Sequence, residues 1–173
     1  MSMDFMDMFK KDYENAEMIV VGIGKEFNND KRISNDQINK IADIIESRNY
    51  FIISSLKENI FKDTKLNKKR ICNPMLIDSS QDKEEHEYES KQWDLYNKWL
   101  SCTLNKKLLI LELGEGFNVP NLFRWPFEKI TMINKKARMY RVNNEFPQIP
   151  EEISEKAFSI KCDSNDFLTD IMK

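Results

Sequence analysis

Residues 108–128 read LLILELGEGFNVPNLFRWPFE, an apolar run that ends in the turn Gly114-Glu115-Gly116. A second apolar run, MIVVGIG at 18–24, ends in Gly22-Ile23-Gly24. The chain has 173 residues and only four glycines, so these two G-x-G turns hold all of them. Short, almost continuously apolar runs are typical of strands that are covered on both faces of a parallel sheet. The two runs therefore predict buried parallel strands, each followed by a glycine turn.

Similar runs and helical patterns alternate along the chain. We expect strands at 17–24, 50–55, 70–77, 107–114, 138–143 and 157–162. Helical patterns occupy 1–16, 34–47, 57–63, 83–104 and 164–172. Strands joined by helices imply right-handed crossovers. The alternation predicts one α/β domain spanning 1–173, a three-layer, Rossmann-like doubly wound sheet of about six mostly parallel strands in the order 3-2-1-4-5-6. The third strand, 70–77, is the weakest of these, because Pro74 suits an edge or a strand end better than a central ladder.

Three of the helical patterns carry further expectations. Ser34 is an N-cap candidate for helix 34–47, and Ser164 for the last helix. Helix 83–104 starts acidic, as helix N-termini prefer, and has one apolar stripe. The stripe consists of Trp93, Tyr96, Leu100 and Leu104. One face of the N-terminal helix carries Phe5, Met8, Phe9 and Tyr13. We expect that face to pack on its own domain rather than on a partner or a membrane.

The overall charge and cysteine pattern exclude several classes of function. The chain has 27 Lys and Arg against 29 Asp and Glu, a formal net charge of −2, whereas nucleic-acid binding needs a concentrated positive field. Cys72, Cys102 and Cys162 lie far apart, without the C-x-x-C pairs of zinc sites. No apolar run has the length of a membrane span, and no signal peptide is visible. We therefore expect a cytoplasmic protein with no metal site, no nucleic-acid partner and no membrane partner.

The glycine turns point to a nucleotide. In a doubly wound sheet, ligands bind at the carboxyl ends of the strands where the strand order reverses. Glycine there lets the backbone approach a phosphate or a ribose. The first and fourth strands are neighbours in the predicted order, so the turns should face each other across one crevice. The alternative is that the glycines only form tight turns, because neither pair extends to a complete P-loop or G-x-G-x-x-G motif and Lys25 alone is only suggestive.

From about residue 107 to 172, the chain resembles the C-terminal half of bacterial sirtuin-like proteins, the NAD-dependent deacylases and ADP-ribosyltransferases. The matching residues are Gly114, Gly116, Phe117, Asn118, Val119 and Pro120 in a G-x-G-F-N-T-P turn, Arg124, Pro126, Phe127 and Glu128 in an R-x-P-F-E helix, and Asn143 at a strand end. The resemblance implies that the glycine turn and Asn143 recognise the adenosine of NAD or ADP-ribose. From the residues alone, Asn143-Asn144 is equally a turn signal.

The N-terminal half has the same layout but departs in its chemistry. The first turn reads Gly22-Ile23-Gly24-Lys25-Glu26, so it lacks the serine of the family's G-A-G-x-S motif. The resemblance places Ser55 and Glu58 at cofactor positions, but Leu56 stands where the family has an asparagine. Residues 73–75, Asn-Pro-Met, stand where the family has a catalytic histidine or glutamine. None of these three is a general base. The cysteine tetrad that binds zinc in sirtuins is absent as well.

We therefore predict a sirtuin-like domain that binds NAD, ADP-ribose or a related adenine nucleotide and is catalytically reduced or inactive. No catalytic residue is assigned. The predicted cofactor-binding residues are Gly22, Gly24, Ser55, Glu58, Gly114, Gly116, Phe117, Asn118 and Asn143. One alternative is an active NAD-dependent deacylase or ADP-ribosyltransferase with Glu58 or Glu115 as its base. Another is a protein-interaction scaffold that uses helix 83–104 and the N-terminal helix to bind a protein partner.

Overall fold

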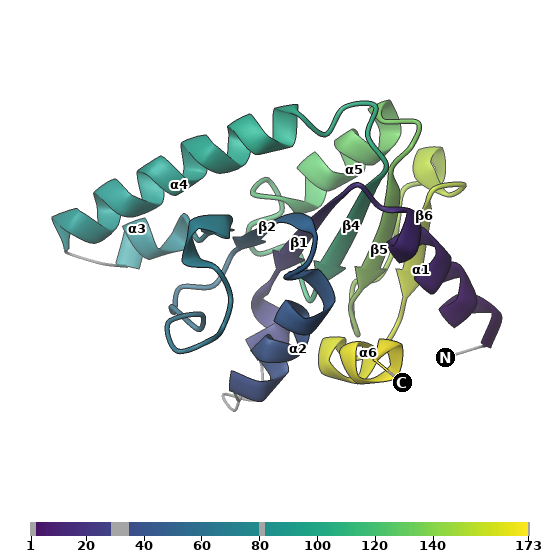
Figure 1. The fold of residues 1–173 in the computed structure, drawn as a ribbon, viewed down its shortest axis with the longest axis horizontal. Helices are drawn as coiled ribbons and strands as arrows, with labels where there is room; N and C mark the ends of the chain where they lie inside the picture. Colours follow the sequence, from purple (N-terminus) through teal and green to yellow (C-terminus); the bar gives the residue numbers. More distant parts are fainter. Residues whose placement is uncertain (1–2, 29–34, 80–81, 173) are drawn as a thin grey trace.

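A six-stranded parallel sheet forms the centre of the protein (Figure 1). The computed structural model describes residues 3–28, 35–79 and 82–172. The strands are β1 (Met18–Ile23), β2 (Asn49–Ser54), β3 (Ile71–Cys72), β4 (Leu108–Leu113), β5 (Arg138–Val142) and β6 (Ala157–Ile160). Every neighbouring pair is parallel and the order is β3-β2-β1-β4-β5-β6. This confirms the predicted fold class and strand order.

Helices cover both faces of the sheet (Figure 1). They are α1 (Met3–Asn15), α2 (Asn35–Ile45), α3 (Met75–Ser79), α4 (Lys83–Ser101), α5 (Arg124–Ile133) and α6 (Ser164–Ile171). Short 3-10 turns lie at Lys25–Asn28, Lys68–Arg70 and Glu151–Ile153. The first hydrophobic cluster includes residues of α1, α2 and α6, and the second includes residues of α4 and α5. In the part of the chain that the structure describes, no helix is both long and apolar enough to cross a membrane.

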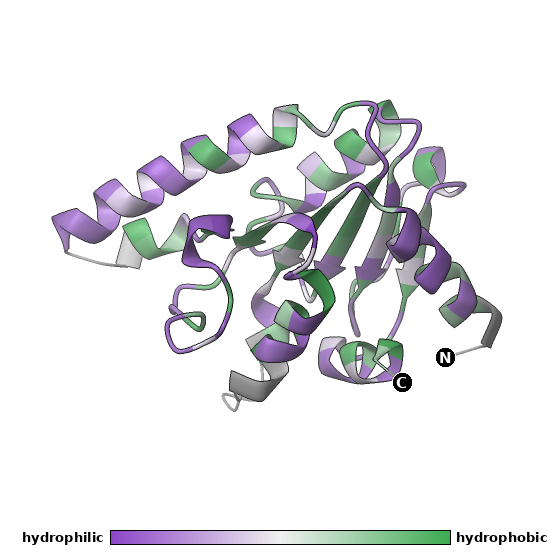
Figure 2. Ribbon diagram, in the orientation of Figure 1, coloured by the Kyte–Doolittle hydropathy of each residue, from purple (hydrophilic) through white to green (hydrophobic). Residues whose placement is uncertain are grey.

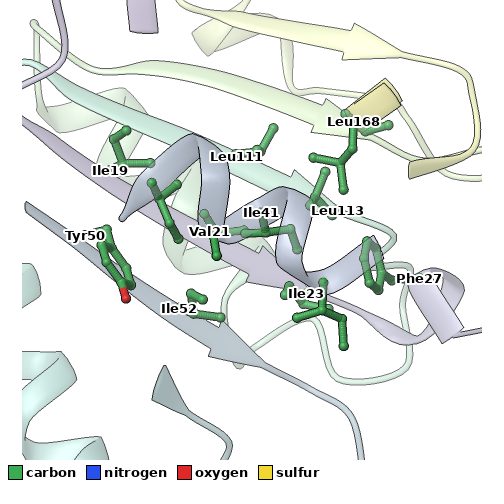
Figure 3. Close-up of a cluster of buried hydrophobic side chains, with 14 of the residues drawn as sticks. Ile19, Val21, Ile23, Phe27, Ile41, Tyr50, Ile52, Leu111, Leu113 and Leu168 are labelled. Atoms are coloured by element: carbon green, nitrogen blue, oxygen red, sulfur yellow. The ribbon is translucent and has the colours of Figure 1, made fainter. Parts of the chain in front are cut away.

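The central strands have apolar side chains on both faces, which explains why their sequences do not alternate with polar residues. Along β1, Ile19, Val21 and Ile23 point into one cluster, shared with Ile41 of α2 and Leu168 of α6 (Figure 3). Val20 points to the opposite cluster, where Tyr96 and Phe127 lie. The central strands are accordingly coloured mostly hydrophobic, whereas much of α1 and α4 is hydrophilic (Figure 2).

One predicted strand is much shorter than expected, although it lies at the edge of the sheet as Pro74 suggested, and one predicted helix is replaced by turns. The run 70–77 forms a strand only at Ile71–Cys72, and α3 follows it. Pro74 explains the break, because proline cannot donate to a strand ladder but suits the start of a helix. Residues 57–63 form turns instead of a helix. There the side chain of Asn59 accepts the N–H of Phe61 (3.3 Å), a local bond that competes with helical pairing.

The packing of α1 is as predicted, whereas α4 is shorter than predicted. Phe9 of α1 is buried, and Phe5, Met8 and Tyr13 pack against the same cluster, so this helix covers its own domain as expected. Helix α4 ends at Ser101, three residues early, and leaves Leu104 exposed.

The helix starts were predicted in part. Helix α6 begins at Ser164 as expected, but its cap is the Asp163 side chain, which accepts the N–H of Asn165 (2.7 Å). The expected cap of the second helix, Ser34, lies outside the described residues.

Candidate functional site

The two glycine turns lie against each other at the carboxyl ends of β1 and β4. The N–H of Gly24 donates to the carbonyl of Leu113 (2.8 Å), and the N–H of Glu26 donates to the carbonyl of Gly114 (2.9 Å). A Cβ atom at Gly24 would lie 2.4 Å from the Cα of Glu115, and Gly114 has a φ of +71°. The turns are thus neighbours, as predicted, but they touch instead of facing each other across an open crevice. Glycine at 24 is required by this close approach.

A pocket of about 240 Å³ lies beside the two turns, at the ends of β1, β4 and β5. We call it the carboxyl-edge pocket. Its lining residues are Lys25, Glu26, Gly114, Gly116, Asn118, Asn143, Glu145 and Phe146. The structure therefore brings together four of the predicted site residues, namely Gly114, Gly116, Asn118 and Asn143. The position agrees with the general rule for ligand sites in doubly wound sheets.

Two exposed aromatic rings stand beside this pocket. Phe117 is 57% exposed and Phe146 is 39% exposed, and their rings meet edge to face with centroids 5.4 Å apart. The Phe117 ring also covers the guanidinium of Arg124, 4.5 Å from the ring centroid. A Cβ atom at Gly116 would lie 3.1 Å from the Phe146 ring, so glycine leaves room for that ring. Exposed aromatic faces of this kind are suitable for stacking with a nucleobase.

Asn143 connects the two walls of the pocket. Its Oδ1 accepts the N–H groups of Glu145 (2.9 Å) and Phe146 (2.6 Å), and its Nδ2 donates to the carbonyl of Glu115 (3.0 Å). The side chain is buried. The Asn143 side chain therefore stabilises a turn, which is one of the two roles that the sequence allowed. Its contact with a ribose stays a prediction.

A buried charged network supports the pocket from below. Arg141 donates from Nε and Nη2 to the two oxygens of Glu112 (2.6 and 3.0 Å). Arg124 donates from Nη1 to the Glu115 carbonyl (2.8 Å) and from Nη2 to the Phe146 carbonyl (3.1 Å). The nearest oxygen of Glu112 lies 3.4 Å from Arg124. Arg124 of the R-x-P-F-E motif thus holds both pocket walls in place.

Sequence reasoning missed Glu112 and Arg141. The signal was present, because each is a charged residue in an otherwise buried strand. The two are register partners in β4 and β5, so their side chains emerge on the same face of the sheet. Opposite charges at matched positions of neighbouring strands predict an ion pair, once the strand order is known.

A second polar pair lies outside the pocket lining. The hydroxyl of Ser55, just after β2, donates to the carboxylate of Glu115. Glu115 is fully buried, and this burial raises the pKa of its carboxyl group. The Ser55 hydroxyl, the backbone N–H of Val119 and the charge of Arg124 act in the opposite direction. The structure thus places a carboxyl group with a raised pKa next to a serine hydroxyl, beneath the second glycine turn.

The remaining predicted residues do not line the pocket. Gly22 faces the rings of Phe123 and Phe127, where a Cβ atom would lie 2.6 and 2.7 Å from ring atoms. Gly24 is covered by the second turn. Glu58 is exposed in the turns after β2.

The charges around the pocket are mixed. Among the described residues that line it, Lys25 is the one cation, whereas Glu26 and Glu145 are acidic. The Glu26 carboxylate accepts the N–H of Asn144 at 2.9 and 3.1 Å, and its pKa is raised mainly by burial. The pocket thus has little net attraction for a highly charged anion, and it offers carboxylate acceptors for hydroxyl groups.

Comparisons with known proteins give limited similarities. No protein-family model matches the chain. Over 82 residues, the chain is 28% identical to a protein ADP-ribosyltransferase of Staphylococcus aureus, a match that covers 47% of this chain and 26% of that protein. The crystal structure of an exopolyphosphatase-related protein from Bacteroides fragilis is similar with a TM-score of 0.56 at 12% identity, covering 99% of this chain and 43% of the other. The structural similarity therefore concerns the fold alone, and each match covers less than half of the other protein.

Proposed function

We propose that the carboxyl-edge pocket binds the adenosine part of NAD, ADP-ribose or a related adenine nucleotide, in a sirtuin-like domain with reduced or absent catalysis. One observation carries the proposal. Gly114, Gly116, Asn118 and Asn143, which the sequence resemblance associates with adenosine, converge on one pocket at the end of the sheet where ligands bind in this fold. The weak similarity to an ADP-ribosyltransferase agrees with a nucleotide-related role.

The pocket fits an adenosine better than a whole dinucleotide. Its volume of about 240 Å³ is below the roughly 300 Å³ at which pockets for drug-sized ligands begin. The rings of Phe117 and Phe146 offer stacking surfaces for adenine, and Glu145 is an acceptor for ribose hydroxyls. Lys25 is placed to pair with a phosphate. The N–H groups of Gly24 and Glu26 already donate within the protein, so the first turn is not a free phosphate cradle.

The residues at the positions of the family's catalytic machinery favour reduced catalysis. Leu56 is buried and apolar where the family has an asparagine. Asn73 is buried, and its N–H donates to the carboxylate of Glu89 (2.8 Å). Neither side chain supplies a general base.

One observation favours the enzyme alternative. The carboxyl group of Glu115 has a raised pKa and accepts from Ser55 next to the nucleotide turn, and carboxylates tuned in this way serve as general bases. An active ADP-ribosyltransferase or deacylase would use this pair on an NAD bound above it. Release of nicotinamide from NAD by the wild type, but not by Glu115→Gln, would establish this alternative.

Calorimetric titration of the whole chain with NAD, ADP-ribose and AMP tests the binding proposal. We expect all three to bind, because adenosine is common to them. Gly116→Val should abolish binding, since its side chain would push against Phe146 and fill the pocket. Circular dichroism checks that this variant remains folded.

Two exposed aromatic residues give a matched pair of variants. Phe117→Ala should weaken binding roughly tenfold, because loss of a ring that stacks on a base costs about 1–3 kcal/mol. Trp125→Ala is the control, because Trp125 is a similarly exposed aromatic residue (52%) in α5, whereas the Phe117 ring packs on Phe146 of the pocket lining. Equal affinities of the Phe117→Ala and wild-type proteins would contradict the stacking role. No binding of any of the three nucleotides would contradict the proposed function and favour the scaffold.

A further inference from the structure

A second pocket lies at the amino ends of the strands, opposite the carboxyl-edge pocket, and its lining is strongly positive. It has a volume of about 310 Å³ and lies where β4 and β5 begin, beside the end of α1. We call it the amino-edge pocket. Its lining residues are Asp12, Asn15, Ala16, Lys107, Leu108, Leu109, Lys135, Lys136 and Arg138. Four cations and one acid thus surround a cavity in a protein whose formal net charge is −2.

Three of the four lining cations, all but Arg138, come from a repeated sequence. Asn-Lys-Lys occurs at 67–69, 105–107 and 134–136, and each copy ends within two residues of a strand, β3, β4 or β5. In a parallel sheet, the segments that precede the strands gather at one edge. Strands β4 and β5 are neighbours, so the second and third copies lie side by side, whereas the first lies beyond β1 and β2.

The two adjacent copies are held together by a buried asparagine. The side chain of Asn134 donates to the carbonyls of Thr103 and Lys106 (both 3.0 Å), and its Oδ1 accepts the N–H of Lys136 (3.0 Å). Asn134 is fully buried. The backbone that carries the lysines is therefore fixed before any ligand arrives, which lowers the entropy cost of binding.

Two acidic side chains nearby offset part of this positive charge. Asp12 accepts from the hydroxyl of Tyr140 (2.7 Å) and lies 3.8 Å from Arg138. Glu17, which follows the lining residue Ala16, is 3.5 Å from Lys106 and accepts the backbone N–H of Lys107 (2.8 Å).

In the part of the chain that the structure describes, the ammonium groups of the three lining lysines have no short ionic contact. Lys107, Lys135 and Lys136 are exposed, and within the described ranges no carboxylate lies within 4.0 Å of their ammonium nitrogens.

Helix capping does not account for the lysines. Cations at the end of a helix often satisfy its last carbonyl groups. At the end of α5 this role belongs to Lys156, whose ammonium group donates to the carbonyls of Thr131, Met132 (3.2 Å) and Asn134 (3.4 Å). Lys135 and Lys136 are left to face the pocket.

We propose that the amino-edge pocket binds a compact diphosphate group, either as inorganic pyrophosphate or as the diphosphate of a nucleotide. Two linked phosphates match a cluster of four cations in charge, and lysine ammonium groups bind phosphate as point charges without strict geometry. This site is separate from the carboxyl-edge pocket, at the other end of the strands, and it does not depend on the nucleotide function proposed there.

Isothermal titration of the whole chain with inorganic pyrophosphate at low ionic strength tests the proposal. We expect saturable binding with one site per chain that weakens as salt is added, because exposed charges are screened. The double variant Lys135→Gln/Lys136→Gln should lower the affinity roughly tenfold, and both side chains are exposed, so folding should be unaffected. The matched control is Lys69→Gln/Arg70→Gln, which removes the same charge beside the Asn-Lys-Lys copy outside the pocket and should leave binding unchanged.

The same titration distinguishes the two sources of the diphosphate. The ADP titrations use the Gly116→Val background, in which the adenosine of ADP should not enter the carboxyl-edge pocket. In that background, equal affinity for pyrophosphate and ADP, with the same loss on replacement of Lys135 and Lys136, assigns the site to the diphosphate group itself. Tighter binding of ADP that the lysine replacements also weaken assigns it to a nucleotide. Gly116→Val should retain pyrophosphate binding even where it abolishes adenosine binding, which separates this proposal from the previous one. No saturable pyrophosphate binding by the wild type, or equal losses in the lysine variant and its control, would overturn the proposal.

Discussion

Replacement of Gly24 by alanine should destabilise the protein far more than the same replacement at Gly116. At Gly24, the added Cβ would lie 2.4 Å from the Cα of Glu115 and 2.5 Å from its nitrogen, about 1 Å short of the 3.4 Å at which ordinary contact begins. Both neighbours are backbone atoms, so the ends of β1 and β4 must separate. At Gly116, the nearest atom is 3.1 Å away in the Phe146 ring, which can rotate.

The structure sets the size of the effect. Forced overpacking costs about 1–3 kcal/mol. Separation of the two turns also weakens the hydrogen bonds from Gly24 to Leu113 and from Glu26 to Gly114, each with a net contribution of about 1 kcal/mol. We therefore expect Gly24→Ala to lower the free energy of unfolding by about 3 kcal/mol. Gly116→Ala should lower it by less than about 1 kcal/mol.

Urea denaturation followed by circular dichroism measures both variants against the wild type. In a chain of this length, 3 kcal/mol corresponds to a decrease of roughly 6–12 °C in the melting temperature. The comparison needs no ligand, so it tests the packing role of the first turn independently of function. Similar stabilities of Gly24→Ala and Gly116→Ala would refute the inference that glycine is required where the turns touch.

Three further predictions concern buried groups. Arg141→Met should lower the free energy of unfolding by about 3–5 kcal/mol, measured by urea denaturation, because it leaves Glu112 fully buried without its main partner. Adding Glu112→Leu to this variant should recover part of the lost stability. A single variant as stable as the wild type would contradict this role. Burial raises the pKa of Glu89 above its ordinary 4.5, so the folded state binds the proton more tightly than the unfolded state. The free energy of unfolding should therefore fall as the pH rises from 4.5 through the raised pKa. The urea midpoint of Glu89→Gln should fall less over the same pH range. Parallel plots of urea midpoint against pH for the two proteins would exclude this contribution. Finally, Cys102 is exposed, whereas Cys72 is buried and its burial raises the pKa of its thiol. Iodoacetamide should therefore modify Cys102 in the native protein and Cys72 only after unfolding, which peptide mass spectrometry measures. Equal labelling rates in the native state would show that Cys72 is accessible.

The fold could be predicted because its signals are local. The runs that became β1 and β4 are apolar at consecutive positions, which distinguishes them from strands with one solvated face. The third strand was predicted too long, because it ends after two residues, before Pro74, and α3 follows. A proline is visible in the sequence, but whether it ends a strand or only marks an edge depends on the neighbouring chain.

The candidate site could be predicted only in part. Gly114, Gly116, Asn118 and Asn143 follow strands whose carboxyl ends share an edge, so their convergence followed from the strand order. Glu26, Glu145 and Phe146 reach the same pocket from loops, and loop paths are set by contacts such as those of Arg124 with the Phe146 and Gln148 carbonyls. No pattern in the sequence identifies those contacts.

The sequence by itself determined that the central strands are buried and that the glycine turns follow two of them, because apolar runs are properties of short segments. The strand order was predicted from the Rossmann-like pattern, and the structure confirmed it. The tertiary structure alone decided what each glycine does. Gly24 admits the backbone of Glu115, Gly22 admits the rings of Phe123 and Phe127, and Gly116 leaves space next to Phe146. The reason is steric: the role of a glycine depends on which atoms occupy the space of the missing side chain, and those atoms come from distant parts of the sequence.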